Sequence, residues 1–181
     1  MASDLDYMKN LLKENKFDYI TIENKKFIVE FTKQMKEIGF SWDGKIGDGF
    51  CWGKNMVIYS KNKKVIARIY IRDDEMKRWG AYDYQFRNGL ALRLFFSNIT
   101  KHIDFIEKAP EYVRNIFVND AGLCHHCGEK CHHRKEYTIG GIDKVQCGNY
   151  FIFREPKVED IKDYISILKE FYGRKTKHRG K

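Results

Sequence analysis

The chain has 181 residues, a mass of 21.6 kDa and a net charge of +9. The length fits one domain, and 43% hydrophobic with 15% aromatic residues exclude a disordered chain, although 33% of the residues are charged. No stretch approaches the roughly 18 apolar residues of a membrane span. Residues 1–16 carry charges throughout and lack the apolar region of a secretory signal. We therefore expect a cytoplasmic protein with no membrane partner.

Two helices are expected first in the chain. Residues 4–15 place apolar side chains at helical spacing behind Ser3, which fits an N-cap position. Residues 25–38 repeat this spacing, and Gly39 stands where a helix commonly ends.

Strands are expected in the middle of the chain, after a glycine- and aromatic-rich turn region at residues 40–53. Residues 55–60 form a first short strand. In residues 64–72 the side chains alternate in character, and residues 89–96 show the same period of two. Antiparallel pairing with one buried face suits this alternation.

The C-terminal part combines helices with a hairpin. Residues 101–118 predict two short helices separated at Pro110, residues 135–153 a hairpin, and residues 158–172 a final helix. The order predicts an α+β fold: an antiparallel sheet with flanking helices and a C-terminal zinc knuckle plus hairpin. We expect one domain over residues 1–173 with a zinc-stabilised subregion at about 119–155, followed by a flexible basic tail at 174–181.

Four of the five cysteines follow a metal-binding spacing. Cys124 and Cys127 enclose two residues, so a tight turn can direct both thiolates at one ion, and Cys131 follows closely. Cys147 comes later, in the hairpin, and is followed by a glycine, as Cys127 is; these glycines permit tight backbone geometry. The expected cofactor is Zn²⁺ in a tetrahedral site, held by Cys124, Cys127, Cys131 and Cys147.

Alternatives to this ligand set remain open at the level of sequence. His125, His126, His132 or His133 could replace one cysteine, and four cysteines also hold iron–sulfur clusters. An odd number of cysteines without an export signal argues against disulfides, and Cys51 is interpreted as a packed thiol. A closed four-thiolate site leaves no position for water, which indicates a structural metal.

An aromatic-rich region predicts a pocket for a small ligand. Aromatic side chains near glycines and a long polar segment are typical of binding sites with a movable cover. The candidate ligand-binding residues are Trp42, Trp52, Trp79, Tyr82 and Tyr84.

The alternative is binding of nucleic acid. Arginines and aromatics on one side of the predicted sheet could contact phosphates and stack on bases. The candidate residues are Arg68, Tyr70, Arg72, Arg93 and Phe95. The tail at residues 174–181 has five basic and no acidic residues, which would attract phosphate backbones without sequence preference.

Catalytic signatures are weak in this sequence. Residues 44–49 lack the spacing of a phosphate-binding loop, and no Gly-x-Ser-x-Gly motif is present. We interpret the acidic residues at 73–75 as a solvated turn at the end of a strand. We therefore favour a binding or regulatory role over catalysis.

The C-terminal third also resembles known proteins. Three features carry the resemblance: the segment from Cys124 through Cys131 to Tyr137-Thr138-Ile139, the tripeptide Cys147-Gly148-Asn149, and the helix from Asp160 to Tyr172. Residues 90–172 resemble small bacterial zinc-binding proteins with a Cys-x2-Cys-x3-Cys…Cys pattern and no assigned activity. The resemblance implies a metal site and no particular reaction.

Overall fold

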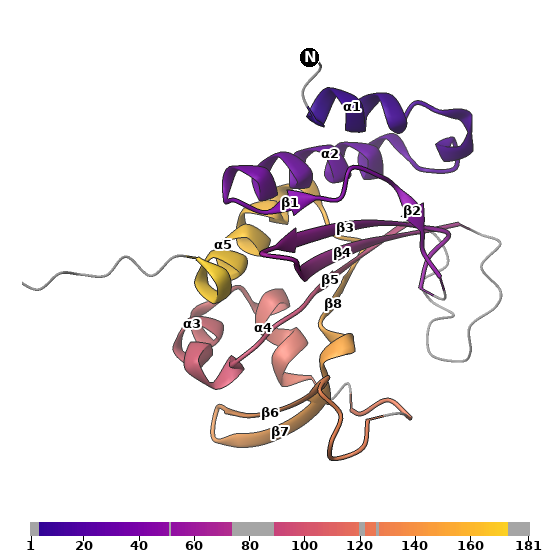
Figure 1. The fold of residues 1–181 in the computed structure, drawn as a ribbon. Coiled ribbons are helices and arrows are strands. Elements are labelled where there is room, and N and C mark those ends of the chain that lie inside the picture. Colours follow the sequence, from indigo (N-terminus) through magenta and orange to yellow (C-terminus); the bar gives the residue numbers. More distant parts are fainter. Residues whose placement is uncertain (1–3, 51, 74–88, 120–121, 126, 174–181) are drawn as a thin grey trace, which may run out of the picture.

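The computed structural model describes residues 4–50, 52–73, 89–119, 122–125 and 127–173 (Figure 1). Its helices are α1 (Asp4–Leu11), α2 (Ile22–Glu37), α3 (Ile103–Lys108), α4 (Glu111–Val118) and α5 (Ile161–Tyr172). Its strands are β1 (Ser41–Trp42), β2 (Gly47–Asp48), β3 (Asn55–Lys61), β4 (Lys64–Arg72), β5 (Gly89–Leu94), β6 (Arg134–Ile139), β7 (Ile142–Cys147) and β8 (Ile152–Arg154).

The main sheet has the strand order β1-β3-β4-β5-β8, and β2 pairs with β3 beside β1. Every neighbouring pair in this sheet is antiparallel. Strands β6 and β7 form a separate two-stranded hairpin. The expected α+β class with an antiparallel sheet is therefore confirmed.

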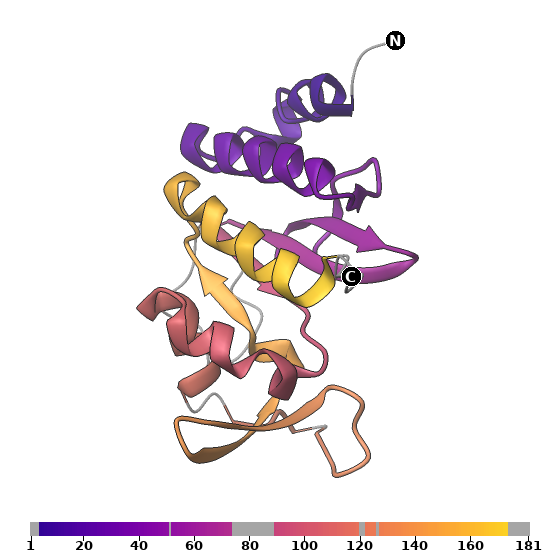
Figure 2. The ribbon, with the colours of Figure 1, turned by 90° about the vertical axis from the view of Figure 1, so that its left-hand side faces the viewer.

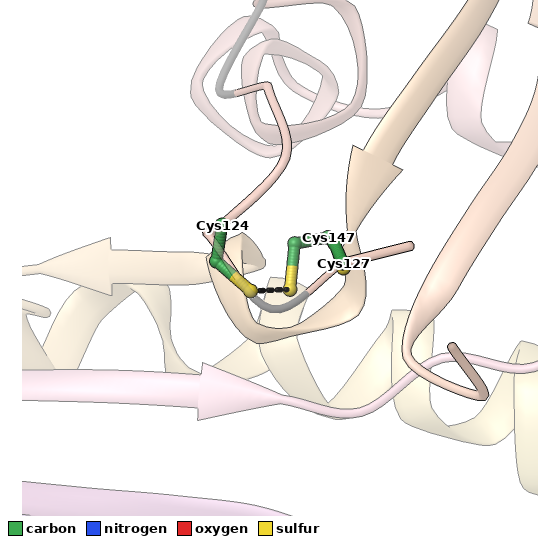
Figure 3. A group of neighbouring side chains, drawn as sticks. All are labelled: Cys124, Cys127 and Cys147. Atoms are coloured by element: carbon green, nitrogen blue, oxygen red, sulfur yellow. Dashed lines mark hydrogen bonds between the residues drawn. The ribbon is translucent and has the colours of Figure 1, made fainter. Parts of the chain in front are cut away.

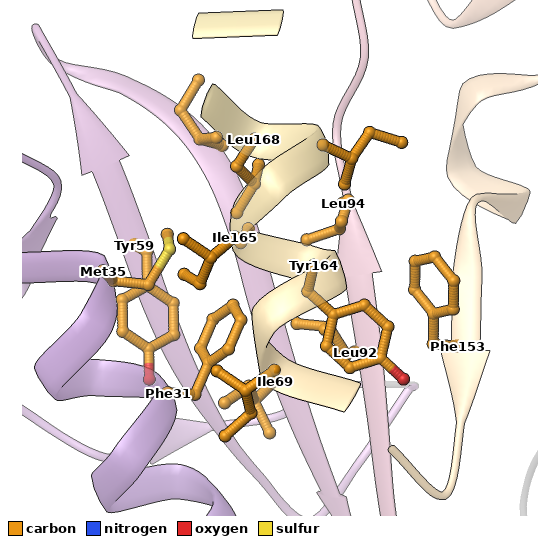
Figure 4. Packing of buried hydrophobic residues seen from close by; sticks show 14 of the residues in the cluster. Phe31, Met35, Tyr59, Ile69, Leu92, Leu94, Phe153, Tyr164, Ile165 and Leu168 are labelled. Carbon is orange, nitrogen blue, oxygen red and sulfur yellow. The ribbon is translucent and has the colours of Figure 1, made fainter. Parts of the chain in front are cut away.

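One face of the sheet is the main core. Val57, Ile69, Leu92 and Phe153 lie in one cross-strand row on this face, and all four are buried. Helices α2 and α5 pack against it (Figures 1, 2 and 4). Burying each such side chain contributes about 1.5–3 kcal/mol, so this interface holds the helices on the sheet.

Helix α2 begins at Ile22, three residues before the predicted start. The Asn24 N–H donates to Thr21 Oγ1 at 3.2 Å, so Thr21 caps the helix. The end agrees with the prediction, since Gly39 has a φ of +81°. None of the described helices, of which α2 has 16 residues, has the length and apolar character to cross a membrane.

Helix α1 is shorter than predicted and ends at Leu11. The chain then turns through a 3-10 segment at Asn15–Phe17, because this turn buries Phe17 and Ile20 in the core. Ser3, the expected cap, lies outside the described residues. Residues 101–118 form α3 and α4, separated at Pro110 as predicted.

The predicted hairpin at residues 135–153 is correct only in its first part. The turn lies at Gly140 and Gly141, both with positive φ, but the hairpin ends at Cys147. The 3-10 segment Gly148–Tyr150 then redirects the chain, and β8 pairs with β5 in the main sheet. The reason is hydrophobic: Phe151 is fully buried and Phe153 is 5% exposed in the main core.

The second face of the sheet is more buried than the alternation of side-chain character along the strands predicts. Met56, Tyr70 and Ala91 lie in one row on this face and form a second buried cluster, against which Trp52 packs. Arg93 on the same face is only 3% exposed. The expectation of one buried face is therefore wrong for the central strands.

Phe117 on α4 joins the hairpin to the rest of the core. Its ring lies 5.1 Å from those of Phe96 and Phe151 and 6.4 Å from that of Tyr137 on β6. The Tyr137 hydroxyl also donates to the Phe117 carbonyl at 2.8 Å. The hairpin is thus attached to α4 by both packing and a buried hydrogen bond.

We predict that Phe117→Ala lowers the free energy of unfolding by about 3–5 kcal/mol, since it leaves a cavity among aromatic rings. Urea denaturation followed by circular dichroism measures the change. Phe50→Ala is the control, because Phe50 is 80% exposed and its loss should change stability by less than about 0.5 kcal/mol. Equal effects of the two substitutions would refute this role of Phe117.

Candidate metal centre

Three cysteine side chains from two separate segments meet beside the hairpin (Figure 3). Cys124 and Cys127 lie in the loop after α4, and Cys147 is the last residue of β7. Their Sγ atoms all lie within 4.8 Å of one another, and those of Cys124 and Cys147 are 3.7 Å apart. The structure therefore brings together three of the four predicted ligands in a group that could hold a metal ion.

Cys131, the fourth predicted ligand, lies beside this group. Its Sγ is 3.7 Å from that of Cys127, but it does not lie within 4.8 Å of all three other sulfurs. The Cys131 side chain is half-buried. It is thus placed at the edge of the group, next to Cys127.

Short backbone turns direct the sulfurs inward. The Cys127 N–H donates to the Cys124 carbonyl at 2.9 Å, and the Cys131 N–H donates to the Gly128 carbonyl at 3.0 Å. These two consecutive turns explain why the C-x2-C-x3-C spacing gathers its thiols on one side of the loop.

Two backbone hydrogen bonds hold the distant segments together. The Cys147 N–H donates to the Gly122 carbonyl at 3.0 Å, and the Gly148 N–H donates to the His133 carbonyl at 2.6 Å. A Cβ at Gly148 would lie 2.8 Å from the His133 oxygen, whereas a Cβ at Gly128 would meet nothing within 4 Å. The two Cys-Gly dipeptides therefore differ. Only at Gly148 does the backbone of another segment come so close that a Cβ atom would not fit.

Two of the S–S distances are compatible with thiolates that share one metal ion. A tetrahedron with Zn–S bonds of about 2.3 Å has sulfur atoms about 3.8 Å apart. The Cys124–Cys147 and Cys127–Cys131 distances are both 3.7 Å. Cys127 and Cys147 are buried, and the side chain of Cys124 is half-buried.

Burial makes the Cys127 thiol a poor acid when no cation is bound. Burial, together with the neighbouring thiols of Cys147, Cys131 and Cys124, raises the pKa of Cys127 to about 12. A metal ion binds the thiolate form and must displace the protons. Affinity for a metal at this site should therefore fall as the pH falls.

Among the described residues the sulfur group contains no imidazole. His125 is exposed, and the rings of His132 and His133 are tilted against each other with centroids 3.9 Å apart. His126 lies outside the described residues. Of the described candidates for a fourth ligand, Cys131 is the one whose sulfur contacts the group, 3.7 Å from that of Cys127.

His133 connects the cysteine loop to the second face of the sheet. Burial lowers its pKa, and the positive charges of His132, Lys135, Arg93 and Arg68 lower it further. The loop therefore lies within electrostatic range of the arginines on β4 and β5.

The predicted nucleic-acid residues do gather on that face. Arg68 and Arg93 are direct cross-strand partners. The Arg93 guanidinium lies over the rings of Trp52 at 4.2 Å and Tyr70 at 5.1 Å, and that of Arg68 lies over Phe95 at 5.3 Å. Arg72 also lies on β4 and is 9% exposed. We call Trp52, Arg68, Tyr70, Arg93 and Phe95 the arginine–aromatic face.

The structure describes two of the five predicted pocket residues, Trp42 and Trp52, and places them in different clusters. Trp42 packs at the edge of the main core, stacks near Tyr7 at 6.0 Å and donates its Nε1–H to the Lys45 carbonyl. Trp52 belongs to the second cluster. The remaining candidates (Trp79, Tyr82 and Tyr84) lie outside the described residues, as do Cys51 and the basic tail at 174–181.

Sequence reasoning missed two features. His102 Nδ1 lies 2.7 Å from Glu170 Oε1, and its ring stacks on Phe171 with centroids 4.1 Å apart. No local sequence motif predicts this pair, because its two residues are far apart in the sequence. A groove between α1 and α2 was also missed, although the repeated lysines of these helices were a visible signal.

Comparison of the chain with models of known families, with curated protein sequences and with solved structures gives no match. The interpretation of the site therefore depends on its geometry and chemistry.

We predict that Gly148→Ala destabilises the protein by about 1–3 kcal/mol, since the added methyl group must push the His133 segment away. It should also reduce the zinc affinity of the cysteine group. Gly128→Ala is the matched control, being the other Cys-Gly step, and should leave both quantities nearly unchanged. Thermal denaturation and competition with a zinc chelator provide the two measurements. Equal responses of the two variants would contradict the close-approach argument.

Proposed function

We propose that Cys124, Cys127, Cys131 and Cys147 hold one structural Zn²⁺ ion, and that the protein is a zinc-stabilised binding protein. The observation that supports the metal assignment is that the sulfurs of Cys124, Cys127 and Cys147 all lie within 4.8 Å of one another, with the Cys131 sulfur 3.7 Å from that of Cys127. Four thiolates around one ion leave no position for water or substrate. The role of such an ion is to stabilise the fold.

An iron–sulfur cluster is the competing cofactor. In a [2Fe–2S] cluster each iron binds only two cysteine thiolates, and the sulfurs on different irons are separated by the bridging sulfides. Three sulfurs that all lie within 4.8 Å of one another therefore favour a single ion. Thiolate ligation also fits a reducing compartment such as the cytoplasm.

We place the small-ligand site on the arginine–aromatic face. Two arginines directly opposite each other repel, and burial adds a desolvation cost. Cation–π contacts with Trp52, Tyr70 and Phe95 offset part of this cost. Such local conflicts commonly occur at functional sites. Positive charge beside flat rings suits a planar, negatively charged ligand.

Nucleic acid is the second candidate for this face. The observation in its favour is that Arg68, Tyr70, Arg72, Arg93 and Phe95 share one side of the sheet. Against it, a stacking platform for bases needs accessible rings, and Tyr70 is only 1% exposed. The partly exposed rings of this face are Trp52 and Phe95, which is enough for contact with one planar ligand but not for a row of stacked bases, so we rank the small ligand first.

We predict that Cys147→Ser lowers the zinc content to near zero and lowers the Tm. A loss of about 3 kcal/mol corresponds to a decrease of about 6–12 °C for a chain of this size. Elemental analysis and calorimetry measure both effects. Cys51→Ser is the control, because Cys51 lies outside the ligand spacing and its loss should leave one zinc per chain.

The fourth ligand is tested separately. Cys131→Ser should weaken zinc binding strongly, whereas His133→Ala should retain one zinc per chain. The opposite pattern would assign the position to histidine, and full zinc content in Cys147→Ser would refute the centre itself.

We predict that aromatic carboxylates or nucleoside monophosphates raise the Tm of the protein. Arg68→Gln should reduce this increase in Tm more than the control Lys101→Gln does, because Lys101 is an exposed lysine on the segment before α3.

A gel shift at low salt with single- and double-stranded probes tests nucleic-acid binding, the second candidate. Retention that survives removal of residues 174–181 and is lost in Arg68→Gln would favour nucleic acid. No response to any ligand or probe would count against both uses of this face.

A further inference from the structure

A groove of about 780 Å³ lies between α1 and α2. These helices lie at the opposite end of the molecule from the β6–β7 hairpin (Figures 1 and 2). The groove is therefore separate from the cysteine centre, and its lining includes no residue of the arginine–aromatic face.

The floor of the groove is apolar. Leu12, 2% exposed, and the partly buried Val29 and Val158 are among its lining residues. Ile22, at the start of α2, also lines the groove but is 80% exposed. An exposed isoleucine next to an apolar depression gains from contact with an apolar ligand.

Lysines surround this floor. Lys9, Lys13, Lys25 and Lys26 line the groove, and no ion pair joins any of them to a carboxylate in the described part of the chain. The only acidic lining residue, Glu30, already accepts a hydrogen bond from Gln34 and lies 3.6 Å from Lys33. The groove thus presents a positive rim above an apolar floor.

The dimensions favour a small molecule over a protein partner. Small-molecule sites measure about 300–1,000 Å³, a range that includes this groove. A specific protein interface takes about 20–30 residues from each side, and ten residues line the groove.

We propose that this groove binds a long-chain carboxylate, with the hydrocarbon chain on the Leu12–Val29 floor and the carboxylate among the lysines. The apolar floor gives the affinity through burial of methylene groups. The positive charges of the surrounding lysines favour a ligand with a negatively charged head group. This site is independent of the zinc proposal and of the ligand proposed for the sheet face.

Titration calorimetry with dodecanoate, kept below the concentration at which it forms micelles, tests the proposal on the full-length protein. We expect saturable binding of one molecule per chain. Shortening the chain to decanoate should weaken binding, by up to about fourfold for each methylene lost. Dodecyltrimethylammonium, which has the same chain and a positive head group, should bind at least tenfold more weakly.

Charge-reversal variants locate the site. Lys25→Glu combined with Lys26→Glu should weaken dodecanoate binding at least tenfold, whereas Lys101→Glu, far from the groove, should not change it. All three lysines can be replaced without removing core contacts, and circular dichroism checks that each variant is folded.

Three results would overturn the proposal. These are equal binding of the cationic amphiphile, unchanged dodecanoate affinity in the double variant, and binding to anionic phospholipid vesicles without binding of monomeric dodecanoate. If the double variant fails to fold, the head-group and chain-length comparisons on the unmodified protein decide the question.

Discussion

The structure depends most on the meeting of cysteine sulfurs from two segments about 20 residues apart in the chain. The thiols of Cys124 and Cys147, 3.7 Å apart, gain little from one another, but a cation held among the cysteines would link the loop after α4 to the end of β7. The chain enters β8 only a few residues after Cys147. Such a link would act together with the burial of Phe151 and Phe153 to hold the last strand in the sheet.

The cysteine centre and the second face of the sheet are physically coupled. His133 follows Cys131 closely, and the charges of Arg93 and Arg68 reach it and help to lower its pKa. Its carbonyl accepts the hydrogen bond from Gly148 that holds the two segments together. His133 thus lies between the cysteine group, which its carbonyl helps to hold together, and the positive charges of Arg68 and Arg93.

Local sequence patterns were sufficient for much of this account. Period-two alternation located β4 and β5, the Gly39 and Pro110 signals located helix ends, and the cysteine spacing located three thiols that could hold a metal ion. The errors arose where tertiary burial overrode local pattern. Phe151 and Phe153 left the predicted hairpin because the main core buries them. The alternation of β4 could not reveal that its second face is also buried, since arginines at those positions normally indicate solvent.

X-ray absorption at the zinc edge, on freshly purified protein, determines whether the cysteines hold zinc. We expect one zinc ion per chain with four sulfur neighbours at about 2.3 Å. A metal-free protein, a spectrum of iron bridged by sulfide, or a zinc shell dominated by nitrogen or oxygen at about 2.0–2.2 Å would contradict it.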